Sequence, residues 1–298
     1  MLEKLFHFIS ALTQSIFTFL KILMRSRLRP HLPKATANSC IILGNGPSLN
    51  PLLKDHLEDL KQRELICVNK FPDTPYYTLI KPSYYIFISP QYWEKKKSDP
   101  NSDERNQIIE ALVQNTAWNL KVLCPYRANE NTDFIARLKQ NVHLSIVFFN
   151  DTPVEGLEKL NRSFFNKGWG LPRPHNVIIP AVFMAIRLGY QNIYLFGADH
   201  SWLPMITVND NNEALINRKH FYDESTAIAE KMYNLEHRPR RLHEILEKFV
   251  YTFSAYFQLE DFATSKGINI WNATPGSYID AFSRITTRDA LIDRPKNE

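Results

Sequence analysis

The chain has 298 residues, of which 44% are hydrophobic and 22% charged, and its formal net charge is +5. These values are typical of a globular protein with one large domain, or a domain and a subdomain. The charge mildly favours phosphorylated ligands or an anionic membrane surface and is too weak to indicate nucleic acid. The three cysteines, Cys40, Cys67 and Cys124, have no CxxC or Cys/His spacing. We therefore expect buried thiols in a reducing compartment and no zinc site.

The pattern of polar and apolar residues in 1–30 predicts an amphipathic helix that lies in the membrane interface. A polar stripe recurs at heptad-like intervals, and apolar side chains cover the rest of the surface; the stripe consists of Glu3, His7, Ser10, Gln14, Lys21 and Arg25. A full span needs ~20 uninterrupted apolar residues, and no small-residue cleavage site follows. Arg25, Arg27 and Arg29 would face anionic headgroups on the inner, cytoplasmic side of the membrane. Two alternatives are a helix packed on the protein's own core or on a partner subunit, and a short tilted span.

Residues 31–38 form a linker into the stretch around which the domain is organised. An apolar run, residues 40–43, ends at Gly44-Asn45-Gly46-Pro47-Ser48, and Asn50 can cap a helix that begins at Pro51. Strand, glycine-rich turn and helix open many nucleotide-binding domains, because glycines admit a ligand to the backbone and helix N–H groups favour phosphate. The turn lacks the third glycine of the dinucleotide fingerprint and the Lys of a P-loop. It fits a routine sharp turn equally well.

Strands and helices alternate along the rest of the chain. Strands are expected at residues 64–68, 84–88, 120–123, 142–149, 192–196 and 268–271, and helices at 107–114, 133–140, 176–188 and 239–265. The Pro-rich stretch 72–82 is expected to be a loop. Two further segments, near residues 150–173 and 203–219, are candidates for a lid. The pattern predicts one α/β domain over residues 39–298, with a mainly parallel, Rossmann-like sheet flanked by helices.

Polar residues follow five of the apolar runs immediately. They are Asn45, Asn69, Ser89 to Gln91, Asp199 to Ser201, and Asn272. Any one of them is more often a turn or cap residue. In a parallel sheet, however, all five positions share one edge, so we expect them to converge on one cleft.

Three blocks of the sequence resemble a known group of enzymes. They are Gly44-Asn45-Gly46-Pro47-Ser48-Leu49, then Val68-Asn69-Lys70-Phe71, and then residues 184–190 leading into Ile193-Tyr194-Leu195-Phe196-Gly197-Ala198-Asp199. In this order they resemble bacterial lipooligosaccharide sialyltransferases. They also resemble the wider group of motility-associated-factor glycosyltransferases and hydroxymethylpterin pyrophosphokinases, which share the Gly-x-Gly-Pro-Ser-Leu turn. The match covers about a quarter of the chain.

The resemblance implies a Rossmann-type domain with a lid, a CMP-activated nonulosonate donor and no required metal or cofactor. It implies that Asn45 and Asn69 contact the nucleotide, that Gly197 lies under it, and that Asn176 falls next to a donor hydroxyl. His220 would be the general base.

The sequence departs from the family pattern at two further positions, and its segment 203–219 is shorter than the family's lid. Ser201 aligns with a phosphate-binding tyrosine, so that role passes to Tyr222, His200 or Lys219. Ser89 stands where the family has asparagine. These departures bear on the sialic-acid donor more than on nucleotide-sugar chemistry in general.

The chemistry of glycosyl transfer requires a base for the acceptor hydroxyl and donors for the departing phosphate. His220 suits the first task because the ordinary histidine pKa lies near neutrality, and His200 is its rival. Asp199 is a turn carboxylate, an orienting partner for a histidine, or a magnesium ligand.

Three functions are therefore compatible with the sequence. The first is an inverting glycosyltransferase on the inner face of a bacterial membrane, which transfers a nonulosonate-type sugar to a surface glycan such as lipopolysaccharide or capsule. The second is a pyrophosphokinase that uses ATP, with Mg²⁺ held by Asp199 and Asp223. The third is a non-catalytic nucleotide-binding protein. A homo-oligomer is compatible with all three.

Overall fold

An eight-stranded, fully parallel sheet forms the centre of the molecule. The computed structural model describes residues 2–94, 102–216, 229–234 and 238–293. The strand order is β11-β10-β6-β1-β2-β3-β4-β5. The bounds are β1 Ser39–Leu43, β2 Leu65–Val68, β3 Tyr84–Ile86, β4 Leu120–Pro125, β5 Leu144–Phe149, β6 Asn192–Phe196, β10 Asn269–Asn272 and β11 Ser283–Arg284. The predicted Rossmann-like α/β fold is confirmed.

Strand β1 is the point at which the direction of winding reverses. From β1 the chain runs outward through β2, β3, β4 and β5, and it then returns to place β6 on the other side of β1. Leu43 pairs with Cys67 of β2 and with Phe196 of β6, so the carboxyl ends of the three central strands are level. Open parallel sheets bind ligands at such a switch point, outside the carboxyl ends of the strands.

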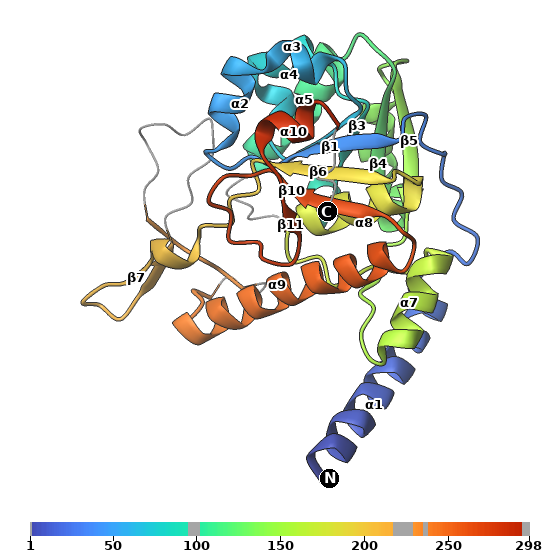
Figure 1. Cartoon of the computed structure of the whole chain (residues 1–298), viewed down its shortest axis with the longest axis vertical. Helices are drawn as coiled ribbons and strands as arrows, with labels where there is room; N and C mark the ends of the chain where they lie inside the picture. The colour runs from blue at the N-terminus through green and yellow to red at the C-terminus, as the bar shows by residue number, and fades with distance from the viewer. Residues whose placement is uncertain (1, 95–101, 217–228, 235–237, 294–298) are drawn as a thin grey trace.

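Helices cover both faces of this sheet, and each face has its own apolar core (Figure 1). One face carries α2 Leu49–Asp55, α3 Leu57–Lys61, α4 Pro75–Ile80, α5 Ser102–Asn115, α6 Thr132–Leu138 and α10 Thr287–Leu291. The other carries α7 Glu158–Lys167, α8 Ile178–Leu188 and α9 Leu242–Thr264. Successive residues of a strand point to opposite faces, so Ile41 and Leu43 belong to the first core and Ile42 to the second. All five residues of β1 are buried, as the apolar run predicts for a central parallel strand.

The predicted lid segment near residues 203–219 contributes two strands to a three-stranded antiparallel sheet, whose third strand comes from beyond that segment. The sheet consists of β7 Ile206–Val208, β8 Ala214–Ile216 and β9 Glu230–Lys231, in the order β7-β8-β9. A small core that includes Ile216 and Phe249 holds it against α9. Within the described residues this segment is therefore a packed hairpin, and its closure over a ligand stays a prediction.

Two segments expected as loops contain helices. In 72–82, Pro75 opens α4, because its fixed φ suits a first helical turn, and Tyr77 packs fully buried. In 150–173, the segment 158–167 is helix α7, and its side chains Phe164 and Phe165 are buried in the core. The aromatic residues of the second segment therefore anchor a helix, and movement of this segment as a lid stays a prediction.

The predicted start of the first helix after β1 is also wrong. Helix α2 begins at Leu49, so Asn50 lies inside it and does not cap it, while Pro51 falls in the first turn. The cap comes from a distant residue, which is described with the site below.

Helix α1, Leu2–Arg25, confirms the expected helix at the start of the chain. It runs alongside α7 and then projects away from the body, with its first residues at the far tip (Figure 1). By length and composition it is the one helix in the described part of the chain that could cross a membrane.

Candidate functional site

The turns that follow β1 and β6 are packed against each other at the switch point. The amide of Gly44 donates to Phe196 O over 2.8 Å, and the amide of Gly46 donates to Gly197 O over 2.8 Å. A Cβ atom on Gly44 would overlap Gly197 O, and one on Gly46 would overlap the Asp199 carboxylate. Gly197 has a φ of +65°, which favours glycine. The glycines of the predicted nucleotide turn are thus required for the contact between the two turns.

Asp199 provides the cap of helix α2. One carboxylate oxygen accepts the backbone N–H of Ser48 over 3.1 Å, and the other accepts the Ser48 hydroxyl over 2.7 Å. Burial raises the pKa of Asp199, and the two bonds from Ser48 oppose that rise. The sequence pattern predicted a phosphate at the N–H groups that begin α2. The Ser48 N–H of this group instead donates to a carboxylate of the protein itself. A catalytic role for Asp199 stays a prediction.

Asn45 presents an unused acceptor at the same edge. Its side chain is 6% exposed and donates through Nδ2 to Val68 O over 3.3 Å. Its Oδ1 atom is buried and has no hydrogen-bond partner among the residues that the structure describes. A buried unsatisfied carbonyl is costly, typically ~1–3 kcal/mol, which makes this atom a good position for a ligand donor. Asn69 follows the neighbouring strand, with an exposed side chain and a left-handed φ of 51°.

His200 lies in a buried polar cluster with Asn176 and Tyr256. The Tyr256 hydroxyl is 2.6 Å from His200 Nε2, and Asn176 Nδ2 is 3.2 Å from the same nitrogen. Because Asn176 Nδ2 can only donate, we assign Nε2 as the unprotonated nitrogen of the ring, to which the Tyr256 hydroxyl can then also donate. Complete burial lowers the pKa of His200 to about 3. This arrangement does not suit the role of general base proposed as the alternative to His220, because the nitrogen is already engaged and the ring is buried.

Asn176 itself serves as a cap. Its Oδ1 accepts the amides of Ile178 and Ile179 at 2.9 and 3.1 Å, at the start of α8. Its Nδ2 atom donates to Tyr256 Oη over 3.0 Å. The side chain is thus fully engaged within the protein, and the predicted contact with a donor hydroxyl would require these bonds to break.

A basic cluster adjoins this site and was missed by the sequence analysis. The His175 ring stacks on Tyr251 at 5.4 Å between centroids, and the Arg173 guanidinium lies 5.6 Å from the same tyrosine ring. Burial, together with the charges of Lys248 and Arg173, lowers the pKa of His175 to about 4. These residues come from the loop before α8 and from α9, and no motif links them in the sequence. The sequence predicted only that residues 239–265 form an amphipathic helix, and it did not predict that this helix packs beside Arg173 and His175.

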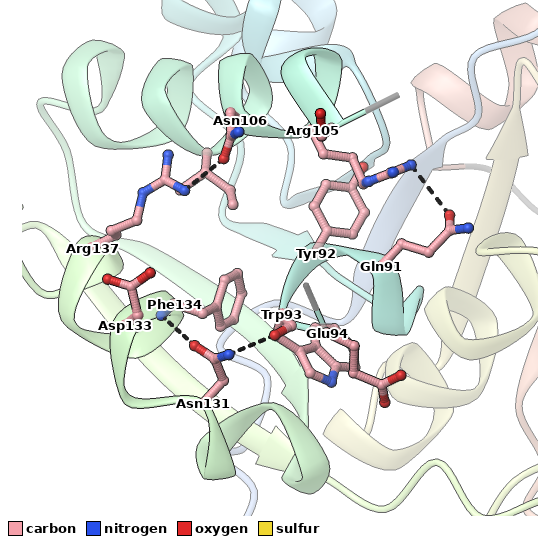
Figure 2. Close-up of a pocket in the computed structure, with 12 residues that line it drawn as sticks. Gln91, Tyr92, Trp93, Glu94, Arg105, Asn106, Asn131, Asp133, Phe134 and Arg137 are labelled. Atoms are coloured by element: carbon pink, nitrogen blue, oxygen red, sulfur yellow. Dashed lines mark hydrogen bonds between the residues drawn. The ribbon is translucent and has the colours of Figure 1, made fainter. Parts of the chain in front are cut away.

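Two pockets open at the same edge of the sheet, on either side of the switch point. One, of about 260 Å³, lies beyond β3 and β4 and is lined by Tyr92, Arg105, Arg137 and neighbours (Figure 2). The other, of about 390 Å³, lies beyond β10 and β11 and includes Asn272. The Asn272 side chain bonds to Ser277 Oγ and Ile279 O, so it organises that turn.

The remaining predicted residues have the following places. Ser89 is half-buried beside the first pocket, its hydroxyl 3.4 Å from Gln91 Oε1. Pro47 is exposed in the turn after β1, and Ser201 is half-buried next to His200. His220, Tyr222, Lys219 and Asp223 lie outside the described residues. Within the described residues, no group of three His, Cys, Asp or Glu side chains is placed to hold a metal ion.

The fold resembles that of solved structures, one of which is described below. No protein-family model matches the chain, and no curated protein matches its sequence. The structure of a MAf glycosyltransferase from Magnetospirillum magneticum AMB-1 resembles it with a TM-score of 0.49 and 10% sequence identity. That match covers 89% of this chain and 36% of the glycosyltransferase, so the chain spans about a third of its length. The sialyltransferase-like grouping stays a prediction.

Proposed function

We propose that the protein is an inverting glycosyltransferase that takes a nonulosonate-type sugar from a CMP-activated donor. The acceptor is a hydroxyl of a cell-surface glycan, and the enzyme acts at the inner face of the membrane. The observation that carries the proposal is the Oδ1 of Asn45, which has no hydrogen-bond partner in the described part of the chain and lies at the carboxyl end of β1, at the switch point of the sheet.

Asn45 can recognise the nucleoside part of the donor. Its Nδ2 donates to Val68 O, which fixes the amide plane and leaves Oδ1 to accept from a ligand N–H or O–H. A ribose hydroxyl or the amino group of cytosine would supply such a donor. Asn69, exposed at the end of the adjacent strand β2, directly follows Val68, whose carbonyl accepts the Asn45 side-chain N–H.

The donor phosphate requires positive charge from elsewhere than helix α2, because Asp199 occupies the first amide there. Arg173 and Lys248 are described cations on the side of α9; Arg173 is paired with Glu155, and the lowered pKa leaves the neighbouring His175 ring uncharged near neutral pH. This side is continuous with the site, because His175 precedes Asn176, and Asn176 contacts His200 beside Asp199. The phosphate would therefore lie toward α9.

In the transfer step, a base removes the proton of the acceptor hydroxyl, whose oxygen attacks the anomeric carbon while CMP departs. We propose His220 as that base. His200 then acts as a positioning residue, since its ring joins the cap of α8 to the turn after β6.

Ligand binding tests the nucleotide assignment. Thermal shift and isothermal titration are carried out with CMP, UDP and ATP, each with and without EDTA. We expect CMP to bind and EDTA to have no effect. Binding of ATP alone, with loss in EDTA, would instead support the pyrophosphokinase.

A pair of asparagine variants tests the site. Asn45→Ala removes the free acceptor and should weaken CMP binding about tenfold, as expected for one hydrogen bond in a buried site. Asn166→Ala, which changes an exposed asparagine of α7, is the matched control. Equal CMP affinity in the two variants would show that CMP does not contact Asn45.

A third variant tests the base. His220→Ala should retain CMP affinity and lose at least ~100-fold in turnover, the usual contribution of general base catalysis. Unchanged turnover would exclude His220 from that role.

A further inference from the structure

The side of α1 that faces the protein buries two polar side chains, Ser15 and Thr18, and one apolar side chain, Ile22. Ser15 and Thr18 are 3% and 1% exposed, and both bond to the segment before α7. The amide of Leu157 donates to Ser15 Oγ over 2.8 Å. Thr18 Oγ1 donates to Glu155 O over 2.8 Å and accepts the backbone N–H of Glu155 over 3.1 Å. A Cβ on Gly156 would overlap Ser15 Oγ, so the helix and this segment are in the closest contact that glycine allows.

We call these hydrogen bonds between α1 and the segment before α7 the latch. The latch continues past the end of the helix. Ser26 Oγ donates to Thr152 Oγ1 over 2.8 Å. Asn150 accepts the amide of Arg27 and donates to its carbonyl, both over 2.8 Å. Helix α1 is therefore fixed to the body from its middle to its carboxyl end and does not act as a free tether.

The opposite side of α1 is apolar and exposed along its whole length. It comprises Leu2, Leu5, Phe6, Phe8, Ile9, Leu12, Ile16, Phe17, Leu20, Leu23 and Met24, each at least 40% exposed; Phe19, at the edge of this side, stacks on Phe164 of α7. A helix that packs on its own protein normally shows the reverse, with the apolar side inward. An exposed apolar surface of this length needs a partner that is itself apolar.

The latch excludes a membrane-spanning arrangement. Because Ser15 is already in contact with the body, only Leu2 to Gln14 project beyond it. At 1.5 Å per residue this part is about 20 Å long, and a bilayer core is about 30 Å thick. A span would draw the charged residues Glu155 and Arg173 into hydrocarbon.

We propose that α1 lies in the plane of one leaflet of an anionic membrane, with its apolar side in the acyl boundary and its latched side toward the body. The charges are complementary to such a surface: up to residue 34 the chain has Lys4, Lys21, Arg25, Arg27, Arg29 and Lys34, against Glu3. Since the helix is fixed to the body, membrane binding sets the orientation of the whole molecule. This inference is independent of the reaction and does not require a nucleotide or sugar.

Vesicle flotation tests the proposal on the full chain. The probe is a vesicle of phosphatidylcholine and phosphatidylglycerol at 7:3, compared with phosphatidylcholine alone. The triple variant Ile9→Gln, Leu12→Gln, Ile16→Gln should reduce partitioning at least ~100-fold, because each residue loses the burial of a large apolar side chain. The matched control, Glu3→Gln, His7→Gln, Ser10→Gln, changes the polar stripe and should stay within threefold of the parent. Omission of the anionic lipid should reduce partitioning tenfold or more.

A labelling experiment separates the arrangements. Cys40, Cys67 and Cys124 are buried, so an impermeant maleimide reports on introduced cysteines only. Glu3→Cys and Arg25→Cys should both react on intact vesicles. Protection of position 3 alone would show a span and overturn the proposal. A wild-type dimer that fails to float, and that becomes a monomer in the triple glutamine variant, would show that the apolar side binds a second copy instead.

Discussion

Acidification should destabilise the protein through His200, and the size of the effect follows from its burial. The ring is fully buried, and its pKa is lowered to about 3 from the ordinary 6.5. A lowered histidine pKa means that the unfolded chain binds a proton between pH 6.5 and 3 while the folded chain does not. Stability is therefore fully present above pH 6.5 and is lost as the pH falls. Each pH unit below 6.5 corresponds to about 1.4 kcal/mol, so at pH 5 the loss from this residue is about 2 kcal/mol.

Urea unfolding at pH 7, 6 and 5 measures this effect. Wild type should lose about 2 kcal/mol more than His200→Asn between pH 7 and 5, because the variant retains a polar group but cannot take up a proton. His143→Gln, which removes an exposed ring, controls for the loss of one histidine and should follow wild type. If wild type and His200→Asn lose stability in parallel, His200 is not a buried neutral ring and the assignment of Nε2 as acceptor is wrong.

Three further changes test the packing and charge of the site and of the latch. Gly44→Ala should destabilise the fold by about 1–3 kcal/mol in urea unfolding, because the new methyl group meets Gly197 O; an effect below 0.5 kcal/mol would contradict the close contact of the two turns. Asn150→Ala removes three hydrogen bonds, to both backbone groups of Arg27 and to Gly168 O. It should raise hydrogen exchange in residues 15–27 at least tenfold, and unchanged protection would mean that the latch does not hold α1. Asp199→Asn should change CMP affinity less than threefold if the phosphate lies toward α9, whereas tighter binding by tenfold would place the phosphate beside this carboxylate.

The sheet could be predicted because its strands are short apolar runs bounded by turn residues. Runs such as residues 40–43 and 193–196 are buried on both faces in the structure, and continuous apolar runs are typical of parallel strands. Their alternation with helices then fixes a parallel arrangement, since each crossover returns the chain to the same edge. The contact between Gly44 and Gly197 was not predicted, because it depends on β1 and β6 being neighbours in the sheet, and the sequence pattern does not give the order of the strands.

The details of the site could not be predicted, because they depend on contacts between distant residues. The capping rules pointed to Asn50, but Asp199 caps α2 across 151 residues of sequence. Likewise, the position of His200 directly after a strand suggested an accessible base. The sequence does not show that Tyr256 of α9 lies beside the ring and engages its Nε2 atom. In α1, Ser15 and Thr18 lie outside the predicted polar stripe, and nothing in the sequence pattern shows that these two side chains face the body.

The position of Asp199 bears on how any anionic ligand can enter this fold. A helix N-terminus typically contributes 0.3–1 kcal/mol to binding of a negative charge. A phosphate about 4 Å from an ionised carboxylate is opposed by about 4 kcal/mol at the effective dielectric of a protein surface. Repulsion therefore wins at the start of α2, although the strand–turn–helix pattern resembles a phosphate site. If the turn after β1 binds the uncharged part of a nucleotide through Asn45, as proposed, the charged part should lie away from Asp199, toward Lys248 and the Arg173–Glu155 pair on the side of α9.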